Sequence, residues 1–225
     1  MPTFEKDGKK LLYVPIDIEV ELPSEEDLLD FHNNNCYTSN DYEDYLDGRH
    51  NFCLIASRHN FEDWRSWPHE IYNDKAKYKQ LLEGHNELFW AKGFRERFPQ
   101  LTALINAAPF KQIAGVGFML QMGPYRAHND SKDPTDPLEP RRYNALLTNP
   151  AHNTFWLEAD GEKIYPKVDP KYPMFAFNNT DVKHGTNDIT GLKIVMAWMG
   201  VIDHEKHEAL INRSVEKFRD KAIWL

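Results

Sequence analysis

The sequence predicts a mainly β fold of the α+β class, and three observations support this prediction. From residue 110 onward the chain divides into short strand-like runs separated by turn signals. Helical spacing of apolar residues is confined to the part before residue 107 and to the end of the chain. With 225 residues, 41% of them hydrophobic, the chain is long enough to bury a sizeable core. We therefore expect a single domain over 1–225.

The first part of the chain, 1–109, is expected to supply supporting elements. Two strands and three helices are predicted: strands at 11–22 and 51–57, and helices that begin at Ser24 and span 73–92 and 94–106. We expect these elements to pack, mainly as helices, against one outer face of the later sheet.

The central part, 110–201, is expected to form the core. Its eight predicted strands are 113–122, 125–130, 142–148, 153–158, 162–166, 173–177, 181–186 and 192–201. Turn signals such as Gly123-Pro124 and Asp160-Gly161 separate them. This arrangement is typical of a double-sheet jelly roll, the cupin-like double-stranded β-helix. A charged helix at 203–221, within the closing segment 202–225, is expected to end the chain.

Charge and composition limit the classes of partner. The net charge is −8 and no segment is rich in Lys or Arg, so duplex nucleic acid is not expected as a ligand. A run of about 18 apolar residues, as a membrane span requires, does not occur. Two cysteines and the lack of a basic-then-apolar start favour a cytoplasmic location.

A metal site is the most specific chemical prediction. His128 and Asp130 are two residues apart, so in an extended strand they project from the same face. His184 follows 56 residues later (184 − 128), after another predicted strand. Two histidines and one carboxylate form a facial ligand set that suits Fe(II) and leaves three coordination positions open. The alternative is that His128 caps a loop and His184 is an ordinary surface histidine.

A cation follows the second histidine on the next predicted strand. Lys193 lies nine residues after His184 (193 − 184), inside an apolar run that extends to Trp198. A buried cation at this position would be suited to hold the far end of an anionic co-substrate.

The order of strand, His-x-Asp, several strands, His and a cation-bearing strand resembles the Fe(II)/2-oxoglutarate-dependent oxygenase family. Over about 110–201 it looks most like the aspartyl/asparaginyl β-hydroxylase group. The resemblance implies that His128, Asp130 and His184 are catalytic and bind Fe(II), with 2-oxoglutarate and O2 at the open positions. It also implies hydroxylation of an amino acid or a peptide side chain, with release of succinate and CO2.

By the same resemblance, Lys193 matches the basic residue that pairs with the far carboxylate of the co-substrate. An arginine is commoner there, and Val195 stands where a hydroxyl residue is often seen. Arg142 is a second candidate, because an arginine can grip a carboxylate through two parallel hydrogen bonds. Asn144 shares the predicted strand face of Arg142 and is expected to look into the barrel as well. A solvent-facing strand start is the alternative for Arg142.

Two other functional classes fit part of the pattern. One is a cupin-fold metalloenzyme without 2-oxoglutarate, such as an isomerase or a dioxygenase, and the other is a metal-free binding module. The proline- and acid-rich segment 131–140 is expected to be a lid or a substrate-facing loop. A small molecule or a peptide is the expected substrate, and the sequence gives no oligomeric state.

Overall fold

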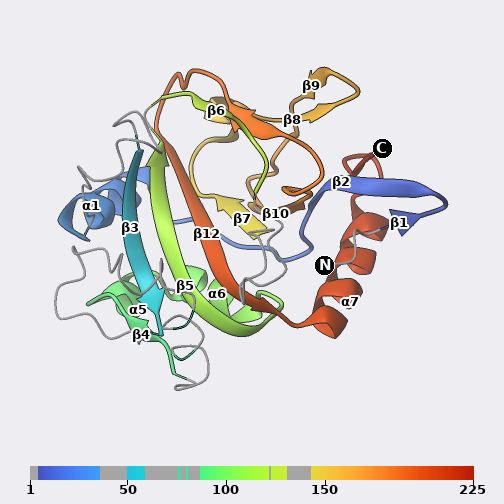
Figure 1. Cartoon of the computed structure of the whole chain (residues 1–225). Coiled ribbons are helices and arrows are strands. Elements are labelled where there is room, and N and C mark those ends of the chain that lie inside the picture. The colour runs from blue at the N-terminus through green and yellow to red at the C-terminus, as the bar shows by residue number, and fades with distance from the viewer. Residues whose placement is uncertain are drawn as a thin grey trace.

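The computed structural model describes residues 5–35, 50–58, 76, 80, 87–121, 123–130 and 143–225, and its core consists of two antiparallel sheets (Figure 1). The larger sheet runs in the order β1 (Glu5–Lys6), β2 (Lys9–Pro15), β10 (Met174–Phe177), β7 (Tyr143–Leu146), β12 (Lys193–Ile202), β5 (Phe110–Gln121), β3 (His50–Ser57) and β4 (Phe89–Trp90), and β13 (Ile223–Trp224) pairs with β2. The smaller sheet runs in the order β6 (Tyr125–His128), β11 (His184–Thr186), β8 (Phe155–Ala159) and β9 (Glu162–Ile164).

The pairing of strands β5 to β12 is nested. The first strand, β5, pairs with the last, β12, and then β6 pairs with β11, β7 with β10 and β8 with β9, all antiparallel. Two of these pairs, β5 with β12 and β7 with β10, lie in the larger sheet, and the other two lie in the smaller sheet. This is the connectivity of a double-sheet jelly roll. The predicted jelly-roll core is confirmed, with strand ends that differ from the predicted ones by a few residues.

Two apolar clusters lie on opposite faces of the larger sheet. Alternation along β12 sends Ile194, Met196 and Trp198 to one face, where they join residues of the helices. The helices of that cluster are α1 (Glu25–Asn35), α5 (Phe94–Arg97), α6 (Pro99–Ala107) and α7 (His204–Lys217). Val195 points to the other face, into a second cluster that also contains Phe155 and Leu157 of the smaller sheet. The predicted helical layer on one outer face is thus confirmed.

Several predictions for the N-terminal part differ from the structure. The strands predicted at 11–22 and 51–57 extend the larger sheet as β2 and β3 instead of packing on it. The helix predicted at 73–92 is wrong at its end, where Phe89 and Trp90 pair with β3. Tertiary pairing prevails there over helical spacing, as is common for aromatic residues. Most of 73–86 lies outside the described residues.

The helix predicted at 94–106 is divided into α5 and α6. The division falls at Phe98-Pro99, because proline has no amide hydrogen and is best tolerated at the first position of a helix. The closing helix α7 is capped by Asp203, whose side chain accepts a hydrogen bond from the Lys206 amide at 3.2 Å. Among the described helices, none combines the length and the apolar character of a membrane span.

Candidate metal centre

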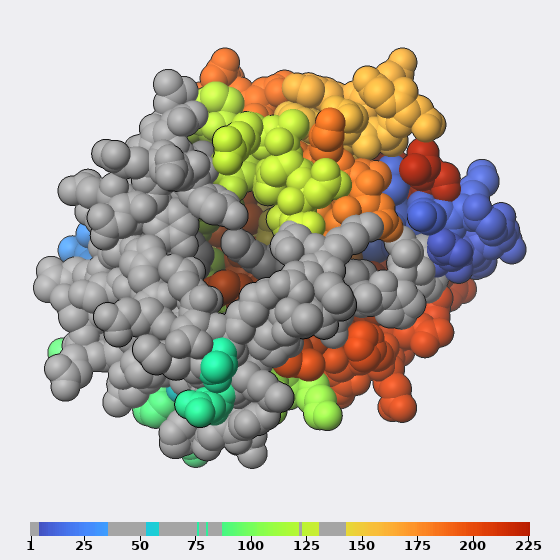
Figure 2. Space-filling view, in the orientation of Figure 1, coloured from blue at the N-terminus to red at the C-terminus, as the bar shows by residue number. Residues whose placement is uncertain are grey.

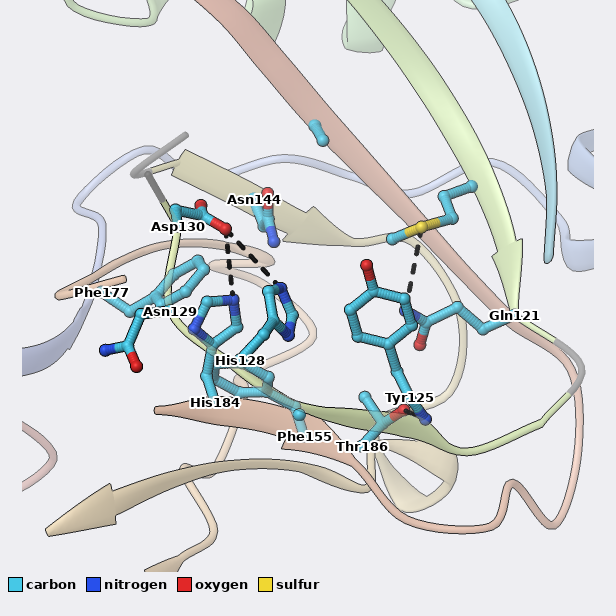
Figure 3. A pocket seen from close by; sticks show the side chains of 13 residues that line it. Gln121, Tyr125, His128, Asn129, Asp130, Asn144, Phe155, Phe177, His184 and Thr186 are labelled. Atoms are coloured by element: carbon cyan, nitrogen blue, oxygen red, sulfur yellow. Dashed lines mark hydrogen bonds and ion pairs between the residues drawn. The ribbon is translucent and has the colours of Figure 1, made fainter. Parts of the chain in front are cut away.

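His128, Asp130 and His184 come together at one end of the smaller sheet (Figure 3). His128 ends β6 and His184 begins β11, and the two are direct cross-strand partners with ring centroids 4.2 Å apart. Asp130 Oδ1 lies 3.6 Å from His128 Nε2 and 3.8 Å from His184 Nε2. One donor atom from each residue lies within 4.8 Å of the others. Such a group can surround a metal ion with two imidazoles and one carboxylate.

Strand β6 contains a bulge between Tyr125 and His128. Tyr125 and His128, three residues apart, face Thr186 and His184, two residues apart, so β6 carries one extra residue. The Tyr125 amide donates to Thr186 Oγ1 at 3.0 Å and anchors the bulged strand. Bulges re-aim side chains near functional sites. The strand ends at His128, so Asp130 lies beyond it, and the prediction of a regular strand over 125–130 is wrong for its last two residues.

Gly185 allows the close approach of the two strands behind the site. A Cβ atom at this position would lie 2.6 Å from the Trp156 ring and 2.7 Å from the Tyr125 carbonyl oxygen. Real Cβ atoms do not approach other atoms so closely, so any larger side chain would push β11 away from β6. Glycine here keeps His184 in reach of His128.

The two imidazoles are oriented by different surroundings. His128 Nδ1 lies 3.0 Å from the Arg126 carbonyl oxygen, and the Tyr125 ring meets the imidazole edge-on at 4.6 Å. When Nδ1 carries the proton it donates to that carbonyl, which leaves the Nε2 lone pair for a metal. His184 is 7% exposed and packs against Phe177, with ring centroids 5.2 Å apart. His184 is thus not the surface histidine of the alternative interpretation.

A cavity of about 180 Å³ opens in front of the three residues. Tyr125 and Gln121 line its side away from the ligands, and Asn144 faces it from β7 (Figure 3). Asn144 Oδ1 and Gln121 Oε1 are buried, and neither has a hydrogen-bond partner among the described residues. Figure 2 shows the surface hollowed below the yellow-green atoms of β6, with orange-red atoms of the colour of β12 inside the hollow.

Lys193 lies on the sheet face that looks toward this cavity. Alternation along β12 puts it on the same face as Val195 and Ala197, and Ala197 lines the cavity. Its cross-strand partner Gln121 lines the cavity too, whereas Lys193 itself is not among the lining side chains.

Lys193 is 1% exposed, and burial lowers the pKa of its ammonium group to about 7. No carboxylate of the described residues forms an ion pair with it. A buried cation in this position lacks a counter-ion within the described part of the chain.

The predicted site residues have different outcomes. The structure brings His128, Asp130 and His184 together and puts Asn144 at the cavity, as expected, but their binding roles stay predictions. Arg142 and the predicted lid 131–140 lie outside the described residues.

The sequence prediction missed Gln121 and Tyr125, which line the cavity. A signal for Gln121 exists, because it is a polar residue at the end of an apolar strand with Met119 on the same face. Tyr125 lies in the bulged strand β6, and the sequence carries no recognisable signal for this bulge.

This chain resembles several solved structures at low sequence identity. The chain matches no family model and no curated protein. A prolyl-4-hydroxylase from Pseudomonas putida shares 16% identity over 78% of this chain and 82% of its own, with a TM-score of 0.38. A Trichoplax adhaerens prolyl hydroxylase, in complex with a peptide fragment of the hypoxia inducible factor, shares 11% over 82% and 78%, with a TM-score of 0.39. The dioxygenase for auxin oxidation 1 of Arabidopsis thaliana, bound to 2-oxoglutarate, shares 14% over 75% and 67%, with a TM-score of 0.36.

Likenesses of this strength carry no argument about this chain. The fold therefore rests on its own strand pairing, and the site rests on its own geometry.

Proposed function

We propose that the chain is an Fe(II)- and 2-oxoglutarate-dependent oxygenase that hydroxylates an amino acid or a peptide side chain. The observation that carries the proposal is the convergence of His128, Asp130 and His184 beside a cavity inside a jelly roll. The resemblance of the sequence pattern to that oxygenase family supports the same conclusion.

The donor set fits Fe(II). Two imidazole nitrogens and one carboxylate oxygen form the facial triad that is typical of non-haem iron oxygenases and that leaves open positions. His128, Asp130 and His184 would hold the metal. When bound, Fe(II) and 2-oxoglutarate supply the activation of O2, which couples decarboxylation of the co-substrate to succinate with hydroxylation of a substrate C–H bond.

Lys193 binds the far carboxylate of the co-substrate. A buried ammonium without a counter-ion is costly, and a carboxylate that enters beside it removes this cost. Gln121 lies next to Lys193 across the strands, and its side-chain amide adds hydrogen-bonding capacity at the same end of the cavity. Arg142 remains the alternative cation, on the sequence pattern alone.

Other side chains line the cavity and exclude water from it. Phe155 and Phe177 form an apolar wall beside His184. An apolar wall excludes water and strengthens electrostatic interactions inside the site. The amide of Asn144 faces the space between this wall and the end near Lys193, where it orients a polar group of the co-substrate or of the substrate.

The buried Lys193 also favours this function over its alternatives. A cupin-fold isomerase or dioxygenase without 2-oxoglutarate has no anionic co-substrate for an inward-facing cation. A metal-free binding module has no use for two imidazoles and a carboxylate with donor atoms within 4.8 Å of one another. Neither alternative explains why the three ligand residues and a buried lysine occur in the same site.

Three finer parts of the proposal rest on separate observations. Assignment to the aspartyl/asparaginyl β-hydroxylase group rests on the sequence pattern, including Arg142 at a strand start. A cytoplasmic location rests on composition. A single domain over 1–225 is supported by the apolar cluster that joins Leu28, Phe98, Trp198 and Leu210, from all three segments of the chain.

Titration calorimetry tests the proposal. We expect one Mn(II), used in place of air-sensitive Fe(II), to bind per chain, and 2-oxoglutarate to bind to the metal-loaded protein. Lys193→Met should keep the metal and weaken 2-oxoglutarate binding roughly 10- to 150-fold. This range corresponds to the loss of about 1.5–3 kcal/mol, the contribution of a hydrogen bond to a charged group. Lys206→Met, at an exposed lysine of α7, is the matched control and should change neither. A chain that binds no divalent metal would refute the proposal.

A further inference from the structure

The turn between β10 and β11 holds the segment that carries Asp130. The Asp130 amide donates to the Asn179 carbonyl oxygen at 2.8 Å. In return, Asn179 Nδ2 donates to Asp130 Oδ2. Asn129 Nδ2 donates to the Thr180 carbonyl oxygen at 3.2 Å. The turn that precedes His184 is therefore attached directly to the segment that follows His128.

The two carboxylate oxygens of Asp130 have separate partners. Oδ1 faces the Nε2 atoms of His128 and His184, at 3.6 and 3.8 Å. Oδ2 accepts the hydrogen bond from Asn179. This hydrogen bond fixes the plane of the carboxylate, so a rotation that turned both oxygens toward the imidazoles would break it. Asn179 therefore engages one oxygen and leaves the other to face the imidazoles.

Asn179 is itself fixed in place. Its side chain is fully buried, at 0% exposed. Its neighbour Asn178 closes the turn, because Asn178 Oδ1 accepts from the Asp181 amide and Asn178 Nδ2 donates to Asp181 Oδ2, both at 3.0 Å. The Asn178 amide also donates to the Leu12 carbonyl oxygen of β2 at 2.9 Å. The donor group of Asn179 thus projects from a turn that is attached to the larger sheet.

We propose that Asn179 is a positioning residue that makes Asp130 a donor of one oxygen to the metal. The inference rests on the proposed function, since it presupposes a metal at His128, Asp130 and His184. With Oδ2 engaged by Asn179, the protein contributes three ligand atoms. A carboxylate free to offer both oxygens would take a fourth position, at the expense of the co-substrate or of O2.

The chain offers a matched pair of variants for the test. Asn179→Leu keeps the volume of the side chain and removes the donor to Asp130, and Asn179→Ala removes the donor with less steric risk. Asn178→Ala removes the hydrogen bonds inside the same turn and leaves the contact with Asp130 in place. Mn(II) affinity is measured by calorimetry, folding by circular dichroism, and the coordination of Co(II) by its visible absorption spectrum.

We expect both Asn179 variants to bind Mn(II) roughly 10- to 100-fold more weakly, the usual effect of losing a partner of a metal ligand. Their Co(II) spectra should differ from that of the wild type. Asn178→Ala should lose less Mn(II) affinity than either Asn179 variant and keep the wild-type spectrum, because the backbone hydrogen bonds of Asn178 to Leu12 and of Asp130 to Asn179 still hold the turn. On an Asp130→Ala background, Asn179→Ala should cause no further loss of affinity, because its effect passes through Asp130.

Three results would overturn the inference. Equal losses in the Asn178 and Asn179 variants would show that Asn179 only maintains the turn. Unchanged Mn(II) affinity and Co(II) spectra in folded Asn179 variants would refute the positioning role and leave the proposed function intact. A wild-type chain that binds neither metal would remove both the inference and the proposed function.

Discussion

Replacement of Lys193 by methionine should stabilise the protein while it weakens co-substrate binding. Methionine is similar in length and apolar, so Lys193→Met removes the buried charge with little change in packing. Lys193 is 1% exposed, and burial lowers the pKa of its ammonium group from 10.5 to about 7. At 1.36 kcal/mol per pKa unit, the charged form costs (10.5 − 7) × 1.36, or about 5 kcal/mol, in the folded state. This value is a ceiling, because local relaxation and water entry reduce such costs.

The pH dependence separates the charge from packing. The unfolded lysine keeps its proton up to about pH 10.5, whereas the folded one releases it above about pH 7. Between these values the unfolded state binds more protons, so the stability of the wild type rises with pH in this window. The gain in the free energy of unfolding from Lys193→Met therefore has its full value at pH 6. At pH 9 the gain falls to (10.5 − 9) × 1.36, or about 2 kcal/mol.

Urea unfolding followed by tryptophan fluorescence measures the effect. Wild type and Lys193→Met are compared at pH 6 and pH 9, without metal or co-substrate. We expect the variant to be more stable at both pH values, with a gain up to about 3 kcal/mol larger at pH 6. A gain that does not change with pH, or a loss of stability at pH 6, would refute the argument that Lys193 is a buried charge without a counter-ion.

Three further predictions follow from the site and the sheet. His184→Ala should abolish Mn(II) binding and succinate formation with an unchanged circular dichroism spectrum, and unchanged succinate formation would contradict the ligand assignment. The dissociation constant of 2-oxoglutarate should rise about tenfold from pH 6 to pH 8, since binding needs the protonated Lys193 with its pKa of about 7, and a flat profile would speak against this partner. Gly200→Ala should cost roughly 1–3 kcal/mol in urea unfolding, because its Cβ would lie 2.2 Å from the Gln112 carbonyl oxygen of β5, and a neutral effect would contradict this close approach.

Local pattern was enough to predict most of the jelly roll. Strand alternation and turn residues such as Asp160-Gly161 are properties of short segments, and in the structure both residues of this turn have positive φ, as expected of such a pair. The fate of Phe89-Trp90 was not predictable in this way, because their strand exists through pairing with β3. Helical spacing described the same residues equally well.

The site, too, was only partly predictable from the sequence. The order of His128, Asp130, His184 and Lys193 along the chain is a sequence property and identified the main candidates. The bulge in β6 depends on its pairing with β11, and the contact of Asn179 with the Asp130 carboxylate joins residues 49 apart in the sequence, so both exist only in the fold. Residue types cannot reveal such contacts without a structure.

Anaerobic titration of the metal-free protein with Fe(II) and 2-oxoglutarate tests the central claim most directly. A weak visible charge-transfer band reports a keto acid bound to iron through two oxygens. We expect the band to appear with one Fe(II) per chain and to be lost at the same co-substrate concentration in Lys193→Met. Iron that binds without producing the band would point to a cupin enzyme without 2-oxoglutarate, and a chain that binds no iron would contradict the account altogether.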